Sequence, residues 1–105
     1  MAISNWVFSD EPNVMVITTR NIINNINPIL SVWHDEEDRM WQFLDGTDVN
    51  EEDAMIVSLE KIVDIDNSVE EVSNLPLGWV AWREQKGSAW RSKKALHGRS
   101  NVDDL

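Results

Sequence analysis

The sequence predicts an α+β fold, with an antiparallel sheet of four to six strands and two or three short helices packed on one side. Short runs of β-branched or alternating apolar residues recur along the chain, as is typical of strands. Two stretches that begin with serine carry apolar residues at helical spacing, which indicates helices. A length of 105 residues supports one modest core, so we expect a single domain over 1–91 and a polar, weakly ordered tail over 92–105.

The composition excludes several classes of protein. The chain has no cysteine, which excludes a disulfide framework, a thiolate zinc site and a thiol nucleophile. No basic region precedes an apolar core near the N-terminus, and no apolar run approaches the roughly 18 residues of a membrane span. We therefore expect a cytoplasmic protein that does not associate with membranes.

The first third of the chain predicts an apolar segment, a strand and a short helical turn. Within residues 1–13, Trp6 to Phe8 indicate either an apolar anchor or an edge strand. The β-branched run at 14–18 predicts a central strand that is buried on both sides. Thr19 is placed to cap a helical turn, and the asparagine-rich residues 24–28 then predict a turn in the chain.

The next stretch predicts a hairpin with an acidic loop. Residues 29–34 and 39–44 alternate between apolar and polar side chains, and the Asp-Glu-Glu-Asp run at 35–38 separates them. In such a hairpin, Trp33 and Trp41 could meet across the two strands.

A second acidic loop, a strand and a helix are expected to follow. Residues 48–53 are acidic, and residues 54–57 are apolar enough for a short strand. Ser58 is placed to cap a helix. Its apolar face would carry Leu59, Ile62 and Val63.

A second helix and a sharp corner are predicted over 66–78. Ser68 and Glu71 have the spacing of a capping box, in which each side chain bonds a free backbone N–H of the first turn. Pro76 ends the helix, and Gly78 allows the backbone to turn into an extended run. The apolar face of this helix would carry Val69, Val72 and Leu75.

Residues 78–84 predict the second clear strand. Alternation places Trp79, Ala81 and Arg83 on one face, and it places Val80, Trp82 and Glu84 on the other. Residues 86–88 form a turn signal, after which 89–91 could pair back on the strand.

Charge is distributed unevenly along a chain whose formal net charge is −10. Residues 1–82 hold sixteen acidic residues against three basic ones, a formal charge of −13, whereas residues 83–99 hold six basic residues against one acidic residue. An acidic surface repels a phosphate backbone and attracts a basic partner, so we expect no binding to nucleic acid. The basic stretch is expected to fold back on the acidic body.

The sequence does not predict a metal site, a cofactor or an active site. His34 precedes the acidic run 35–38, but five consecutive residues in a loop cannot all converge on one ion. The acidic runs 45–53 and 64–71 lack the ligand spacing of a calcium loop. No nucleophile elbow, phosphate-binding glycine loop or dinucleotide fingerprint is present, so we expect a protein that is not an enzyme and binds no cofactor.

The six tryptophans suggest both core packing and an interface. Because Trp79 and Trp82 are expected on opposite strand faces, at least one of them is predicted to be partly exposed. An exposed tryptophan is a frequent anchor in protein interfaces. Arg83 and Arg91 lie near these rings in sequence and could stack on them or pair with the acidic body.

Residues 14–91 resemble a family of small bacterial proteins of unknown function that is assigned to immunity class thirty-three of polymorphic toxin systems. The resemblance rests on the order and spacing of Trp41, Phe43, Gly46, Ser58, Leu59, Ile62, Asp66, Ser68, Val69, Leu75, Pro76, Gly78, Ala81, Arg83 and Trp90.

The resemblance implies an inhibitor that binds and neutralises a cognate toxin without catalysis. A toxin that acts on nucleic acid is often basic, which would fit the acidic body. The expected contact residues are Asp35, Glu36, Glu37, Asp38, Asp48, Glu51, Glu52 and Asp53, with Trp79 or Trp82 as an anchor. The alternatives are an interaction or self-assembling module that forms a homodimer through residues 79–90, and a hydrolase that uses carboxylates.

Overall fold

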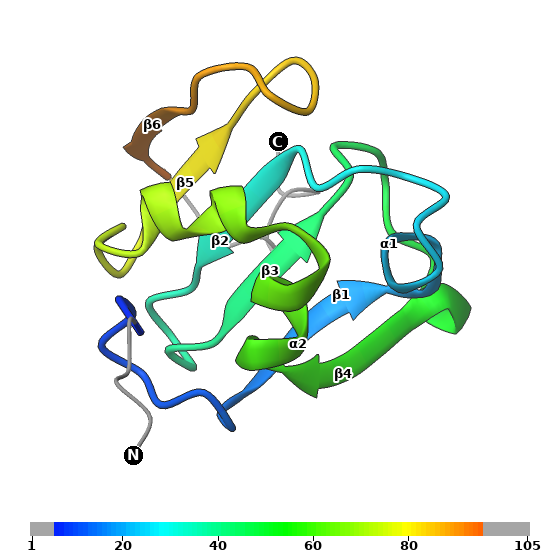
Figure 1. Ribbon diagram of the computed structural model, residues 1–105. Coiled ribbons are helices and arrows are strands. Elements are labelled where there is room, and N and C mark those ends of the chain that lie inside the picture. The colour runs from blue at the N-terminus through cyan, green and yellow to red at the C-terminus, as the bar shows by residue number, and fades with distance from the viewer. Residues whose placement is uncertain (1–5, 96–105) are drawn as a thin grey trace.

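The computed structural model describes residues 6–95 and confirms the predicted α+β fold. Figure 1 shows one open sheet with short helices packed against it. The strands are β1 (Met15–Thr19), β2 (Ser31–His34), β3 (Trp41–Leu44), β4 (Ala54–Ser58), β5 (Trp79–Trp82) and β6 (Arg91–Lys94). The α-helices are α1 (Arg20–Ile23) and α2 (Leu59–Ile65), and the 3-10 helices are η1 (Glu51–Asp53) and η2 (Asn67–Val72).

The six strands lie in the order β4-β1-β3-β2-β5-β6. All neighbouring pairs are antiparallel except β1 and β3, which are parallel, with Ile17 opposite Gln42. The sheet is therefore mostly antiparallel, as predicted, and the parallel pair of β1 and β3 is the exception. After β1 the chain forms α1 and β2, and β3 then pairs with β1. The β2–β3 hairpin therefore lies beside β1 through its second strand, β3.

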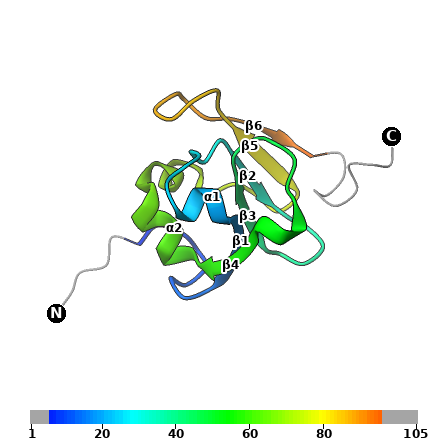
Figure 2. The same cartoon turned by 90° about the vertical axis from the view of Figure 1, so that its right-hand side faces the viewer.

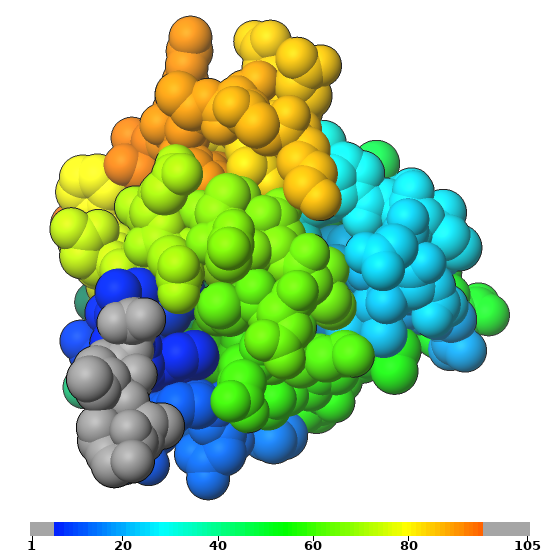
Figure 3. All heavy atoms as spheres, in the orientation of Figure 1, coloured from blue at the N-terminus to red at the C-terminus, as the bar shows by residue number. Residues whose placement is uncertain are grey.

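The core lies on one face of the sheet, under α2 and η2 (Figure 2). In the space-filling view of Figure 3, residues of α2 and η2 cover the middle of this face. Alternation along the strands directs one set of side chains into the core, and the helices add a second set. The strands contribute Val16, Val32, Trp41, Phe43 and Ala81, and the helical segments contribute Ile22, Leu59, Ile62, Val69 and Val72.

Aromatic rings close one end of this core. Phe8 is buried and makes an edge-on contact with Trp41, with ring centroids 5.3 Å apart. Trp6 packs on Phe8, and both indoles bond Asp10: Trp6 donates to its backbone carbonyl at 2.6 Å and Trp41 to its carboxylate at 2.8 Å. The described part of the N-terminal segment is therefore an apolar anchor, not an edge strand.

The starts of the helices agree only partly with the sequence signals. Ser58 caps α2 as predicted, because its hydroxyl accepts a hydrogen bond from the Lys61 N–H. The cap of η2 is Asp66 and not Ser68, and Glu71 is exposed on the surface instead of closing a capping box. Thr19 occupies the cap position of α1, but its hydroxyl makes no cap bond.

Two predictions about individual strands were wrong. β1 lies next to the edge of the sheet, and Met15 is 51% exposed, so the strand is not buried on both sides. Trp33 lies opposite Gln42, and Trp41 lies opposite His34. Because neighbouring residues point to opposite faces, the two tryptophans do not meet across the hairpin.

The folded domain extends beyond the expected boundary at residue 91. β6 pairs with β5 from Arg91 opposite Trp82 to Lys94 opposite Trp79. Residues 92–94 are therefore part of the sheet, whereas the strand partner was expected at 89–91. Residues 96–105 of the predicted tail lie outside the described residues.

Candidate partner-binding surfaces

The acidic loop between β2 and β3 presents two of its four carboxylates to solvent without an internal role. The Asp35 carboxylate accepts a 2.6 Å hydrogen bond from the Gln42 amide, and the Asp38 carboxylate accepts one from the Met40 N–H at 2.9 Å. Both residues therefore shape the loop. Glu36 and Glu37 are exposed, and among residues 6–95 neither carboxylate has a hydrogen-bond or ion-pair partner.

The second acidic segment, from Asp48 to Asp53, leads into β4. Asp48, Glu51 and Glu52 are exposed, and η1 is built from the last three residues of the segment. Arg20 fastens this turn to α1, since its guanidinium donates to the Glu52 carbonyl at 2.8 Å and lies 3.9 Å from the Asp53 carboxylate. A partner could therefore contact the exposed carboxylates of Asp48, Glu51 and Glu52.

The two acidic segments do not form one surface. Asp35–Asp38 precedes β3 and Asp48–Asp53 follows it, so the segments lie at opposite ends of that strand. The first and last residues of a four-residue strand lie about 10 Å apart. The eight residues expected to contact a partner therefore divide into two groups, of which only the second adjoins the edge of the sheet.

Trp79 and Trp82 lie on opposite faces of β5, as predicted, and both are half-buried. Trp79 packs against the core, and the ammonium group of Lys93 lies 5.5 Å from the centre of the Trp82 ring. The two indoles are thus separated by the sheet and cannot together form one anchor. Because Trp79 and Ala81 pack on the core, Trp82 is the member of the pair on the opposite face of the sheet.

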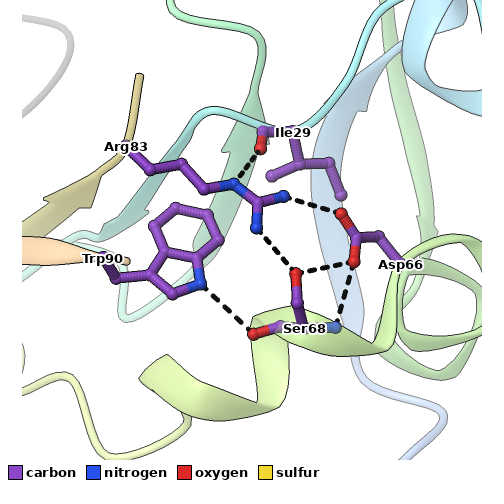
Figure 4. A network of polar contacts seen from close by, with 5 residues as sticks. All are labelled: Ile29, Asp66, Ser68, Arg83 and Trp90. Atoms are coloured by element: carbon purple, nitrogen blue, oxygen red, sulfur yellow. Dashed lines mark hydrogen bonds and ion pairs between the residues drawn. The ribbon is translucent and has the colours of Figure 1, made fainter. Parts of the chain in front are cut away.

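Arg83 forms the most extensive polar cluster of the described chain (Figure 4). Its guanidinium donates to the Ile29 carbonyl at 3.0 Å, the Ser68 hydroxyl at 2.8 Å and the Asp66 carboxylate at 2.7 Å. The Arg83 guanidinium also lies over the Trp90 ring, with its Cζ 4.2 Å from the ring centre. The Trp90 indole N–H donates to the Ser68 carbonyl at 3.3 Å. The cluster ties β5 and the segment before β2 to the start of η2.

Asp66 is held as a carboxylate in this cluster. Burial raises the pKa of the Asp66 carboxyl, but hydrogen bonds from Ser68 and Arg83, together with the charge of Arg83, outweigh burial. The pKa of Asp66 therefore lies below its ordinary value of 3.8. Because partners within the chain satisfy this charge and the Arg83 charge, the cluster stabilises the fold and presents no group for chemistry.

The expected salt bridge and ring stacking of Arg83 are confirmed, but for Arg91 they are not. Arg91 is exposed and makes neither contact within the described chain. The sequence did not pair Arg83 with Asp66 in particular. The Asp-x-Ser spacing signals only the hydrogen bond from the Ser68 N–H to the Asp66 carboxylate, and no local pattern indicates the pairing of Asp66 with Arg83.

Most of the other motif residues have structural roles. Trp41 and Phe43 stack within the core with ring centroids 6.0 Å apart, and Leu75 is buried. Gly46 and Gly78 both have positive φ angles, 87° and 84°, which glycine adopts without strain. The resemblance therefore rests on residues that determine the fold.

His34 ends β2 and is partly buried beside a core aromatic ring. Its ring stacks on Trp41 with centroids 3.8 Å apart, and its Nδ1 lies 2.8 Å from the Leu75 carbonyl. Within residues 6–95, no three His, Asp or Glu side chains gather where they could hold a metal ion. The helices of the same residues are too short or too polar to cross a membrane.

The β4 edge, meaning the side of Ala54–Ser58 that faces away from β1, is a candidate surface that the sequence did not reveal. β4 ends the strand order, and no described strand pairs with its outer side. Ile56 is 64% exposed there. The apolar run predicted a short strand, and no sequence signal distinguishes an apolar edge strand from an interior one.

No protein-family model, curated protein or solved structure matches this chain. The resemblance to immunity class thirty-three therefore stays a prediction.

Proposed function

We propose that this chain is a non-catalytic immunity protein, which binds a basic toxin and blocks it. The observation that carries the proposal is the division of charge in the structure. Asp66 and Arg83 neutralise each other inside the fold, whereas Glu36, Glu37 and most other acidic side chains face solvent without partners among the described residues. Such a surface attracts a basic protein over several ångströms and accelerates its capture.

The absence of an activated group in the described polar cluster supports a binding role. General acid–base catalysis needs a titratable group with access to substrate, and Asp66 is buried, hydrogen-bonded and held ionised. Neutralisation of a toxin requires only that the chain occupy a surface that the toxin needs. The resemblance to immunity proteins supplies the biological setting for that binding.

A self-assembling module that uses the tryptophans of residues 79–90 is the second candidate, and the packing favours it less. Trp79 is committed to the core, and Trp90 covers the Arg83 guanidinium. Only Trp82 stays on the open face, with Lys93 beside it. A single half-buried ring next to a cation is a small contact for a stable homodimer.

Affinity capture followed by a neutralisation assay tests the proposal. The tagged chain is incubated with extract of the source cells, and bound proteins are identified by mass at low and high salt. The matched control replaces Glu36, Glu37, Glu51 and Glu52 with glutamine, which retains side-chain size and removes charge.

We expect one basic protein on the wild-type chain, less of it on the control, and its release as salt rises. Expression of the captured partner alone should arrest the growth of the host cells, and co-expression of this chain should restore their growth. Capture of a partner whose expression leaves growth unaffected, or equal capture by the control, would contradict the proposal.

A further inference from the structure

The β4 edge carries unpaired backbone groups at known positions. β4 pairs with β1 in a register that places Ile17 opposite Ile56, and the Leu59 N–H donates to the Val14 carbonyl at 2.8 Å. Since hydrogen-bonded pairs alternate along an antiparallel ladder, the backbone of Val57 faces β1. The N–H groups of Ile56 and Ser58 therefore face away from the sheet, where no described strand receives them.

The side chains beside these backbone groups are apolar and exposed. Ile56 is 64% exposed and Met15 is 51% exposed. Val16 is in the core, and the register places Ile56 opposite Ile17, so Ile56 and Met15 lie on the sheet face opposite the core. A strand added at this edge would lay alternate side chains against Ile56. An uncharged edge of this kind readily pairs with another extended chain.

The opposite edge of the sheet is protected against such pairing. All four residues of β6 are exposed, and Arg91, Lys93 and Lys94 place three cations along the strand. Charged side chains, lysine above all, are a common means of preventing edge-to-edge association. A basic segment would be repelled from β6 and not from β4.

Charge at the start of β4 indicates which segment the edge would accept. Glu51 and Glu52 lie in η1, which leads directly into β4, and they are exposed, whereas the charge of Asp53 is partly compensated by Arg20. A segment that carries lysine or arginine would gain attraction at this end. A second copy of the chain would instead bring another formal charge of −10.

We propose that β4 accepts an extended basic segment of the partner protein as a seventh strand of the sheet. Hydrogen bonds to the backbone of Ile56 and Ser58 hold the segment, its apolar side chains cover Ile56, and its cations lie near Glu51 and Glu52. This inference rests on the proposed function and specifies the surface by which the partner is bound.

Peptide binding followed by NMR tests this docking mode directly. The probe is a short blocked peptide of alternating lysine and valine, added to the full chain labelled with ¹⁵N. Two matched peptides serve as controls: one has glutamate in place of lysine, and one is N-methylated along the edge that would pair. Amide hydrogen exchange reports which N–H groups become bonded.

We expect the lysine peptide to slow exchange at the Ile56 and Ser58 amides about ten-fold when its concentration is about ten times Kd. Neither control peptide should do so. No protection at millimolar lysine peptide would overturn the proposal, as would equal protection by either control peptide or protection confined to β6 or the 35–38 loop. Assembly of the chain with itself through β4, seen as exchange protection that rises with protein concentration, would also overturn it.

Two variants separate pairing at the edge from general electrostatic attraction. Ile56→Pro removes the outward N–H of residue 56 without removing a bond to β1. Because the added strand then loses one of its two hydrogen bonds to β4, the peptide should no longer protect the Ser58 amide from exchange. Ile56→Lys adds a repelling charge, and its matched control is Ile26→Lys, since Ile26 is 65% exposed in the turn that follows α1 and is not part of β4. Equal peptide affinity for the two lysine variants would contradict docking at β4.

The outcomes distinguish this inference from the proposed function. If the peptides fail at β4 but the captured toxin is still neutralised, the docking mode is wrong and the function stands. If the lysine peptide binds at β4 but capture yields no toxin, the edge accepts basic strands and the immunity role is wrong.

Discussion

The two ion pairs of the described chain, Arg83–Asp66 and Arg20–Asp53, join the same chemical groups in opposite surroundings. The first pair has a 2.7 Å contact, and its side chains are 1% and 7% exposed. The second has a 3.9 Å contact, and its side chains are 57% and 42% exposed. Water screens the second pair and is excluded from the first.

Burial therefore decides what a charge does in this protein. In the interior, the charge of Arg83 is matched by Asp66, and removing one partner would leave the other unpaired in a medium of low polarity. On the surface, carboxylates such as Glu36 and Glu51 contribute little to the fold and stay available to a partner.

Replacing Arg83 should have the largest effect on stability. Arg83→Met keeps much of the side-chain volume but leaves Asp66 buried without its cation, so we expect a loss of about 3–5 kcal/mol in the free energy of unfolding. Chemical denaturation measures the loss. The matched control is Arg20→Met, which breaks the exposed pair and should cost about 1 kcal/mol or less. Similar losses in both variants would contradict the distinction.

Ser68→Ala should have an intermediate effect. The Ser68 hydroxyl donates to the Asp66 carboxylate at 2.7 Å and accepts from Arg83 at 2.8 Å, so its loss removes two bonds within a buried cluster. We expect a loss of about 1–3 kcal/mol in the free energy of unfolding. Ser73→Ala is the control, because Ser73 follows η2 and no side-chain hydrogen bond connects it to the cluster. An Ser68→Ala variant as stable as this control would contradict the role of Ser68.

Acid should remove the contribution of Asp66 to stability. The pKa of Asp66 in the folded chain lies below 3.8, so the folded state favours the carboxylate more than the unfolded state does. This contribution is therefore complete above the unfolded pKa and is lost as pH falls through the folded pKa.

The pH dependence can be assigned to Asp66 by comparing Asp66→Asn with Asp64→Asn in denaturation experiments over the acidic range. Asp64 is exposed in α2 and two residues away. We expect Asp66→Asn to be less stable near neutral pH and to lose less stability on acidification. A pH dependence as steep as that of Asp64→Asn would indicate that other carboxyls carry it.

Neutralising the exposed carboxylates should barely alter the fold. Glu36→Gln with Glu37→Gln removes two charges that have no partner among the described residues, so the denaturation midpoint should stay unchanged. Asp35→Asn is a useful contrast, because Asp35 accepts a hydrogen bond from Gln42 and shapes the loop. A large destabilisation by the glutamate pair would show that those charges serve the fold.

Much of the fold could be predicted because local patterns and packing agree. The β-branched run before Thr19 became β1, Ser58 capped α2, and the apolar positions Leu59 and Ile62 entered the core. Pro76 and Gly78 placed the corner before β5. In each case a short segment carried its own signal.

The order of the strands and the identity of the edges could not be predicted. The parallel pairing of β1 with β3 joins residues that are 25 positions apart, such as Ile17 and Gln42, and no local signal encodes it. For the same reason the exposure of Ile56 was not foreseen, since an apolar strand is expected in the interior. Pairing of Asp66 with Arg83 likewise depends on tertiary contact.

The sequence predicted which acidic residues would contact a partner, but it did not predict where they lie relative to one another. The acidic residues 35–38 and 48–53 were expected to form one contact region, but β3 separates them. Only the second segment adjoins β4, which makes Glu51 and Glu52 the stronger candidates for contact with a strand at that edge.

The most direct test of the account measures stability and association in the same variants. Once the basic partner is purified, its association rate constant is measured at several salt concentrations for the wild type, for the four-site glutamine variant of Glu36, Glu37, Glu51 and Glu52, and for Arg20→Met. Denaturation midpoints are measured in parallel. We predict that the four-site variant associates more slowly, with a flatter dependence on salt, and unfolds at the wild-type midpoint. An unchanged association rate in a stably folded four-site variant would contradict the claim that the exposed carboxylates serve to capture a basic partner.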